Sequence, residues 1–298
     1  MFPVPRAKVT TEATKLLDFI KPNVGRILVI TGAGVSTDSG IPDYRGAEGT
    51  YVTNKNYKPI FHQQFVSNHT SRQRYWARSF IGYSQMTRAK PNDIHRSITE
   101  LEKTGITNGL ITQNVDNLHR EAGTENLLEL HGNIQRVNCI ECKRTYGREQ
   151  IQMELSRMNP EVELILRGFQ AKGEFPHMNP DGDVELGDFS YTRFSYPKCD
   201  QCHGILKPSV VFFGDNLDIE TATRAQSMER NSDAVLVLGT TLSTLSSYRI
   251  VKAARERQVP VAIVNLGKTR ADDIANLKFD IPCLPVVSEI TRALVNTM

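Results

Sequence analysis

Short apolar runs alternate with amphipathic segments along most of the 298-residue chain. Several of these runs are continuous and rich in β-branched residues, which is typical of strands buried on both faces of a parallel sheet. The predicted strands are residues 27–30, 109–112, 127–130, 210–213, 234–238 and 261–264. Apolar residues at helical spacing predict helices at residues 10–20, 94–101, 219–230 and 245–257. The pattern therefore predicts an α/β fold, a Rossmann-like open parallel sheet with helices on both faces.

Two stretches interrupt this alternation and predict inserted modules. Residues 46–90 hold no parallel-strand pattern and one helix, at 71–83, whose arginines are predicted to form a solvated face. Residues 137–206 hold four cysteines and a polar, acidic segment at 173–188, which predicts a mobile surface loop. The Rossmann-like domain is accordingly assigned to residues 1–45, 91–136 and 207–298, with a helical insertion at 46–90 and a cysteine-bearing module at 137–206.

Composition and charge narrow the class of partner. The 36 basic and 33 acidic residues leave a net charge of +3, which is too small to favour nucleic acid as the main partner. No apolar run approaches the ~20 residues that span a bilayer, so no membrane partner is expected. The stretch from Met1 to Lys8 is too short for a transit peptide, and the presequence of an imported protein would lie outside this sequence.

Four of the five cysteines form two C-x-x-C pairs, Cys139 with Cys142 and Cys199 with Cys202. Each pair is a knuckle that presents two thiolates to one ion, and four thiolates satisfy tetrahedral Zn²⁺ without leaving an open position. A coincidental spacing and a redox dithiol are the alternatives. In a chain without a secretory signal, the pattern favours one structural zinc ion and a reducing compartment.

The segment Gly32-Ala33-Gly34 follows the first predicted strand. Glycines at these positions let the backbone approach a bulky ligand, and a helix beginning just beyond them would direct its positive end at a pyrophosphate. The fingerprint of hydride-transferring dehydrogenases needs a third glycine, where Thr37 stands, and a distal acid that is absent here. The segment therefore predicts a dinucleotide site and disfavours a dehydrogenase.

Polar residues follow several predicted strands, and ligands bind at the carboxyl ends of strands in open parallel sheets. Gln113 to Asp116 offer two amides and a carboxylate, which suit ribose hydroxyls and a carboxamide. His131 ends another strand and is followed by Gly132, which leaves its ring accessible. Imidazole is well suited to general-base chemistry near neutral pH. By contrast, His119 is predicted to make a local structural hydrogen bond.

The strings GAGVSTDSGIPDYR and TQNVDNLH resemble the signatures of the sirtuins, the NAD-consuming protein deacylases, and the resemblance extends over residues 10–295. RQRYWAR, PDGDV, VVFFGD and TRADD resemble the class II mitochondrial branch, closest to the fourth of the mammalian set. The resemblance implies that His131 and Asn114 are catalytic and that the four cysteines bind structural zinc. The residues assigned to NAD are Gly32, Ala33, Gly34, Asp43, Tyr44, Arg45, Gln113, Asn114, Val115, Asp116, Gly239, Thr240, Thr241, Ser243, Asn265, Leu266, Gly267 and Cys283.

The same resemblance implies an NAD-dependent protein-lysine deacylase that yields nicotinamide, free lysine and an O-acyl-ADP-ribose. Phe213-Gly214-Asp215 matches the segment that pairs with an acylated peptide as a strand. Ser79 and Gly82 stand where the succinyl- and malonyl-preferring branch has a Tyr-x-x-Arg pair, so a preference for those groups is not expected. Longer acyl groups are expected to be favoured over acetyl, which would gain little from a long acyl channel. A mono-ADP-ribosyltransferase and a weakly active NAD or ADP-ribose sensor are the alternatives. The expected compartment is the mitochondrial matrix, with the cytoplasm as the alternative.

Overall fold

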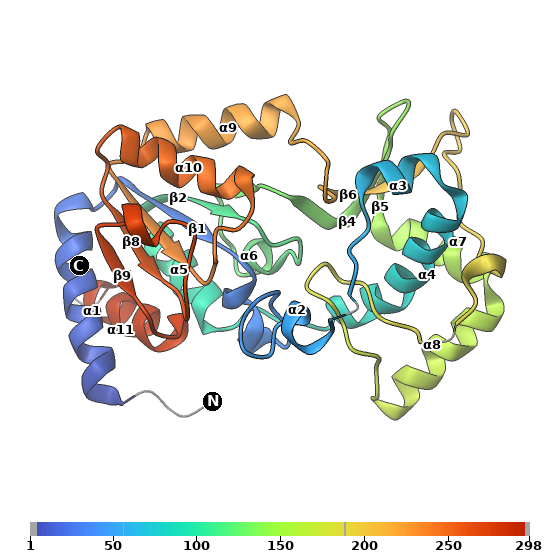
Figure 1. Cartoon of the computed structure of the whole chain (residues 1–298), viewed down its shortest axis with the longest axis horizontal. Helices are drawn as coiled ribbons and strands as arrows, with labels where there is room; N and C mark the ends of the chain where they lie inside the picture. Colours follow the sequence, from blue (N-terminus) through green and yellow to red (C-terminus); the bar gives the residue numbers. More distant parts are fainter. Residues whose placement is uncertain (1–4, 56, 188, 296–298) are drawn as a thin grey trace.

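A computed structural model describes residues 5–55, 57–187 and 189–295 of the chain, which form two lobes side by side (Figure 1). The larger lobe is built on a six-stranded parallel sheet with the strand order β3-β2-β1-β7-β8-β9. Its strands are β1 (Ile27–Thr31), β2 (Thr107–Thr112), β3 (Leu127–Glu129), β7 (Ala234–Leu238), β8 (Val261–Val264) and β9 (Leu277–Phe279). The order diverges in both directions from the β1–β7 pair, which creates a crevice at the carboxyl ends of these two strands.

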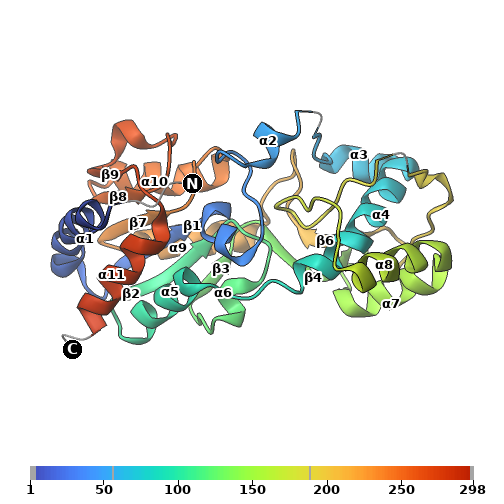
Figure 2. The ribbon, with the colours of Figure 1, turned by 90° about the horizontal axis from the view of Figure 1, so that it is seen from below.

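Helices cover both faces of this sheet, as Figure 2 shows. One face packs against α1 (Arg6–Ile20), α5 (Asp93–Lys103) and α11 (Cys283–Val295), and the other against α9 (Ile219–Arg230) and α10 (Leu245–Glu256). Successive side chains of one strand point to opposite faces of the sheet and pack in the two layers between the sheet and its helices. Both layers are apolar, which explains the continuous apolar runs and confirms the predicted fold class.

The smaller lobe has an antiparallel sheet with the order β5-β4-β6 and four helices around it. Its core is rich in aromatic side chains, including the fully buried Trp76 and Phe80. Its elements are α3 (His62–Ser67), α4 (His69–Met86), β4 (Gly132–Cys139), β5 (Thr145–Gly147), α7 (Arg148–Met158), α8 (Pro160–Lys172) and β6 (Leu206–Val210). The short helices α2 (Thr50–Thr53) and α6 (Leu118–Glu121) lie in connections.

The prediction of a parallel strand at 210–213 is wrong. The strand here is β6, Leu206–Val210, and it pairs antiparallel with β4 in the smaller sheet. An apolar run reports burial, and burial alone does not distinguish the two kinds of sheet. The predicted module boundaries at 136/137 and 206/207 fall inside strands β4 and β6, respectively. Helices α7 and α8 and strand β9 were not predicted.

The arginines of α4 do not form a solvated face. Arg78 is 2% exposed; its guanidinium donates to the Val184 carbonyl at 2.9 Å and pairs with Asp183 at 2.9 Å and Glu185 at 2.6 Å. Arg72 is half-buried and bonds to backbone carbonyls, whereas Arg74 is exposed. The carboxylates that Arg78 meets lie about a hundred positions away, beyond the reach of a local pattern.

The same contacts correct the surface-loop prediction for part of 173–188. Met178 bridges to Val184, and both side chains are buried, as are Asn179 and Asp183. The segment is therefore packed against α4 at this point. Asp188 lies outside the described residues. No helix in the described part of the chain is long and apolar enough to cross a membrane.

Candidate active site

A cavity of about 1420 Å³ lies at the carboxyl edge of the six-stranded sheet, and both lobes line it. Residues that follow five separate strands meet there, namely Gly32 after β1, Gln113 after β2, His131 after β3, Gly239 after β7 and Asn265 after β8. The predicted gathering of these residues is confirmed. The volume exceeds the roughly 300–1,000 Å³ of most small-ligand sites, so the cavity has room for a dinucleotide together with part of a second ligand.

The glycine segment after β1 packs directly on the backbone after β7. The Gly34 N–H donates to the Gly239 carbonyl at 2.9 Å, and a Cβ on Gly34 would also lie 2.9 Å from that oxygen. A side chain here would collide with the backbone after β7, so this close approach of the two segments at the cavity edge requires glycine. The predicted α-helix is wrong, because Ala33–Val35 and Thr37–Ser39 are short 3₁₀ turns. Gly40, at φ 82°, ends the second turn and leads the chain back to the cavity.

Most residues assigned to NAD from the sequence line this cavity. They are Gly32, Ala33, Gly34, Asp43, Tyr44, Arg45, Gln113, Asn114, Val115, Gly239, Thr240, Thr241, Ser243, Asn265, Leu266 and Cys283. Asp116 and Gly267 are not among the lining residues. The Asp116 carboxylate is buried behind the wall, accepts from the Ser36 hydroxyl at 2.7 Å and has a pKa raised by burial. The Gly267 N–H donates to Asp280 at 2.6 Å.

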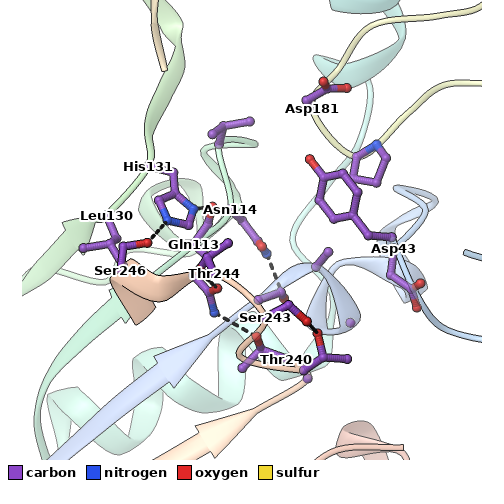
Figure 3. A pocket seen from close by; sticks show the side chains of 18 of the residues that line it. Asp43, Gln113, Asn114, Leu130, His131, Asp181, Thr240, Ser243, Thr244 and Ser246 are labelled. Carbon is purple, nitrogen blue, oxygen red and sulfur yellow. Dashed lines mark hydrogen bonds between the residues drawn. The ribbon is translucent and has the colours of Figure 1, made fainter. Parts of the chain in front are cut away.

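Two amide side chains are fixed by the protein itself (Figure 3). Gln113 Nε2 donates to Thr240 Oγ1 at 2.9 Å and to the Thr31 carbonyl at 3.1 Å. Asn114 Nδ2 donates to the Gly32 carbonyl and to Ser36 Oγ, both at 3.1 Å. Gln113 Oε1 also accepts from the Thr244 hydroxyl at 3.2 Å. Because these hydrogen bonds already use the donors of both amides, the two side chains have little freedom to rotate, and their remaining oxygen lone pairs can accept from a ligand.

His131 stands in the cavity wall with both ring nitrogens occupied (Figure 3). Nδ1 lies 3.2 Å from the Gln113 carbonyl oxygen, and Nε2 lies 2.8 Å from Ser246 Oγ. Burial lowers the pKa of His131 to about 4, against a smaller opposing effect of the Gln113 bond. The ring is therefore neutral at pH 7, which is the protonation state that a general base requires.

His119 is separate from this wall. Its ring is buried, its Nε2 lies 3.0 Å from Thr31 Oγ1, and its centroid lies 4.6 Å from that of His95. The hydrogen bond predicted for it exists, but it spans distant parts of the sequence instead of being local. Burial lowers the pKa of both histidines, so they belong to the core of the larger lobe.

The smaller lobe contributes an acidic group to the cavity. Asp181 and Pro180 line it, and the Tyr57 hydroxyl donates to Asp181 Oδ2 at 3.1 Å. Asp181 Oδ1 is buried without a hydrogen-bond partner. Figure 3 shows Asp181 across the cavity from His131. The carboxylate raises the pKa of Tyr44, although burial of that phenol is the larger cause.

The segment after β6 forms another part of the rim. Phe213, Gly214 and Asp215 line the cavity, and the Phe213 carbonyl accepts from the His62 N–H at 2.9 Å. The Asp215 carboxylate pairs with Lys207 at 3.1 Å and lies 3.0 Å from His62 Nδ1. Together with the Asp215 N–H, which donates to the Phe212 carbonyl at 3.0 Å, these contacts hold the segment as a turn beside the cavity, with Gly214 at φ 76°.

The four paired cysteines converge as predicted. Their sulfur atoms all lie within 4.8 Å of one another, with Cys139 and Cys202 at 3.5 Å and Cys142 and Cys199 at 3.6 Å. Zn–S bonds of about 2.3 Å in a tetrahedron place sulfurs about 3.8 Å apart. The donor set and spacing fit one zinc ion held by four thiolates, with no position left for a substrate.

Sequence reasoning missed several residues of the site. Ser246, Thr244 and Asp181 line the cavity, and Ser36 links Asn114 to Asp116. Each acts through a partner that is distant in sequence, which no local spacing reveals. Ser36 lies inside the glycine motif, so its position was the only available signal.

A glycine cradle, fixed amides and a neutral histidine around one cavity define a dinucleotide-dependent enzyme of the α/β class. The sequence matches the model described as the Sir2 family over residues 32–246, which is more than half of the chain. The chain therefore belongs to the Sir2, or sirtuin, family. Sirtuins use NAD as a co-substrate.

Two relatives and one solved structure illustrate the similarity. The NAD-dependent protein deacylase SIR4 of Batrachochytrium dendrobatidis is 44% identical over 292 residues, which cover 96% of this chain and 95% of the relative. The mitochondrial NAD-dependent protein lipoamidase sirtuin-4 of Bos taurus is 38% identical, covering 96% and 89%. A Sir2 complex with a p53 peptide and NAD⁺ has a TM-score of 0.69 at 28% identity, covering 95% and 97%.

Proposed function

We propose that this chain is an NAD-dependent protein-lysine deacylase of class II that favours longer acyl groups over acetyl and uses His131 as its general base. The observation that carries the proposal is the neutral imidazole of His131 in the same cavity as the Gly32–Gly34 cradle. Family membership and deacylase relatives at 38–44% identity support it. The products are nicotinamide, free lysine and an O-acyl-ADP-ribose.

Different residues of the chain have different roles in the proposed reaction. The glycine cradle and the fixed side chains of Gln113 and Asn114 hold the co-substrate in one orientation. Bound NAD supplies the ribose carbon to which the acyl oxygen is transferred. His131 accepts a proton from a ribose hydroxyl at Nε2, and its Nδ1–H stays on the Gln113 carbonyl. Fixed geometry of this kind lowers the entropic cost of reaction.

The peptide is proposed to bind as an extended strand along Phe213-Gly214-Asp215. The segment lies at the cavity mouth, and a similar Sir2 structure contains a peptide together with NAD⁺. Strand addition draws its affinity from main-chain hydrogen bonds, so it tolerates different side chains around one acyl-lysine. This property suits an enzyme with several protein substrates.

The preference for longer acyl groups rests on helix α4. The Ser79 hydroxyl is buried and accepts from Arg148 at 3.0 Å, and a Cβ on Gly82 would collide with the Gly182 carbonyl. The segment around Gly182 therefore covers one of the two positions at which a carboxylate-binding pair would be expected, and Arg148 is bonded to the other. Each CH₂ of a longer chain contributes about 0.8 kcal/mol when buried, which an acetyl group cannot gain.

Asp181 refines this preference. Its carboxylate lines the cavity opposite His131, and one oxygen has no partner. A carboxylate in this position repels a second carboxylate at short range. Among the longer groups, a neutral lipoyl chain is therefore proposed to be a better substrate than a methylglutaryl chain, which ends in a carboxylate.

The proposed compartment is the mitochondrial matrix. The resemblance to the class II branch supports it, together with the bovine relative whose name gives a mitochondrial location. The cytoplasm is the alternative, and imaging of the tagged full-length protein beside a matrix marker distinguishes them.

The proposal is tested by incubating the pure protein with NAD and a panel of acetyl-, succinyl-, methylglutaryl- and lipoyl-lysine peptides, with mass-spectrometric detection of all products. We expect lipoyl-lysine to have the highest kcat/KM. We also expect one O-acyl-ADP-ribose to form for each lysine that is deacylated. Transfer of ADP-ribose to a protein side chain instead identifies a mono-ADP-ribosyltransferase. Binding of NAD without turnover of any peptide identifies a sensor.

A further inference from the structure

The Ser246 hydroxyl oxygen lies 2.8 Å from His131 Nε2, the atom that accepts the proton in the proposed reaction. The sequence pattern did not indicate a role for this serine. It is the second residue of α10, and His131 follows β3, so the contact joins elements 115 positions apart. Figure 3 shows the serine beside the ring, joined to it by a hydrogen bond. This contact makes Ser246 a candidate for setting the orientation and the tautomer of the His131 ring.

The hydrogen bonds of His131 fix its tautomer. The Gln113 carbonyl can only accept, so the hydrogen of the neutral ring is on Nδ1. Nε2 then carries the lone pair, and the Ser246 hydroxyl is the donor in the second bond. The serine therefore occupies the same lone pair that is needed to accept a proton during the reaction.

The start of α10 is anchored to the same residue that anchors the histidine. The hydroxyl of Thr244, just before the helix, donates to Gln113 Oε1 at 3.2 Å, while the main-chain carbonyl of Gln113 accepts from His131. Gln113 is held in turn by Thr240. The contacts form a closed circuit from Gln113 through His131 and Ser246 to α10 and back, which sets where Nε2 lies.

We propose that Ser246 is a positioning residue for His131: its hydroxyl holds the ring with Nε2 toward the cavity in the Nδ1–H tautomer, and it yields the lone pair to the ribose hydroxyl when the co-substrate binds. The inference rests on the proposed function of His131. Ser246 is not required to touch the reacting atoms. Its contribution is the orientation and the basicity of the ring that does.

Two consequences follow from removing the hydroxyl. The ring gains rotational freedom, so the step that uses the base slows, by about 3- to 10-fold for one neutral hydrogen bond. The donor to Nε2 also favours the neutral ring, so its loss raises the pKa of His131, on the same scale by roughly 0.5 to 1 unit. Both ring partners are uncharged, and none of the charged residues that line the cavity, which include Asp181, Asp215 and Arg249, is bonded to the ring.

The experiment compares Ser246→Ala, Ser246→Thr and Ser227→Ala with the wild type in the zinc-loaded full chain. Threonine keeps the hydroxyl, and Ser227 is an exposed serine of the neighbouring helix α9 whose hydroxyl bonds to Asn231, outside the circuit of His131. NMR of ¹⁵N-histidine-labelled protein gives the tautomer and the pKa of His131 without substrate. We expect Ser246→Ala to raise this pKa and mix the tautomers, and the other two variants to retain the wild-type values.

Kinetics supply the second readout. We expect Ser246→Ala to lower kcat for deacylation while leaving nicotinamide exchange, which precedes the base-dependent step, at the wild-type rate, and threonine to restore kcat. An unchanged tautomer and pKa in Ser246→Ala overturn the proposal, as does a kcat that rises. If the wild type shows no deacylation, the proposed function fails, and the NMR titration still decides whether Ser246 positions the ring.

Discussion

The two lobes bury different kinds of side chain. In the larger lobe, β1 and β7 are buried at every residue, and Thr31 is the only polar residue in either strand. The smaller lobe encloses Cys139, Cys199 and the guanidinium groups of Arg78 and Arg148, whereas the other two cysteines of the cluster are exposed. Arg148 is fully buried, with its guanidinium 4.4 Å from the Tyr83 ring centroid. The larger lobe is therefore stabilised mainly by apolar burial, and the smaller lobe by specific partners without which its polar groups would be costly.

Loss of zinc is the largest expected effect and falls on the smaller lobe. Chelation of the metal, or Cys199→Ser, removes interactions that are worth about 10–16 kcal/mol in zinc-finger peptides. We expect about one zinc ion per chain by metal analysis and unfolding or aggregation after chelation, followed by circular dichroism. Cys283→Ser is the control, since this cysteine lies in the larger lobe away from the cluster. A metal-free protein with full stability and activity would contradict the assignment.

Removal of one buried cation tests the same lobe without touching the metal. Arg78→Met leaves Asp183 and Glu185 facing an apolar side chain, and breaking a buried ion pair costs about 3–5 kcal/mol. Glu185 is partly exposed, so the lower end of that range is expected. The exposed Arg74→Met, on the same helix, should change the free energy of unfolding by less than about 0.5 kcal/mol. Equal urea midpoints for the two variants would show that the Arg78 pairs contribute nothing.

Acid should destabilise the larger lobe through its buried histidines. Burial lowers the pKa of His95 to about 4 from an ordinary value near 6.5. Between these values the unfolded chain binds a proton that the folded chain does not, so stability falls as the pH falls from about 6.5 toward 4. One such group accounts for up to about 3 kcal/mol. We expect His95→Asn to show a shallower dependence of unfolding free energy on pH; a slope identical to that of the wild type would refute this.

The smallest effect concerns the choice of acyl group. Asp181→Asn removes the charge opposite His131 and keeps an oxygen for Tyr57. We expect kcat/KM for methylglutaryl-lysine to rise about fivefold relative to lipoyl-lysine, which corresponds to about 1 kcal/mol of repulsion. Glu161→Gln, at an exposed position of α8, is the matched control. If both variants keep the wild-type ratio of the two substrates, Asp181 does not select by charge.

The contrast between the lobes also explains what the sequence could predict. The sequence predicts an element where that element buries a continuous or periodic apolar face. This holds for strands β1, β7 and β8 and for helices α1, α9 and α10. The positions of Gln113 and His131 follow, because the ends of parallel strands must meet at one edge. The convergence of the four cysteines is predicted from the spacing of the two C-x-x-C pairs alone.

The remaining parts depend on contacts between distant residues. The burial of Arg78 depends on Asp183, and the position of His131 depends on Ser246. The antiparallel pairing of β6 depends on β4, and the 3₁₀ turns after Gly32 depend on the backbone approach at Gly239. None of these partners is near in sequence, so neither periodicity nor local motifs could reveal them.

The most direct test of the central claim is the turnover of lipoyl-lysine peptide with NAD by the wild type and by His131→Ala, with fold and zinc content verified for both. Loss of a positioned general base typically lowers the rate by about 10²–10⁴. We predict a loss of this size with an unchanged melting temperature within a few degrees, and the same loss for His131→Tyr. Turnover by either variant at the wild-type rate would contradict the account.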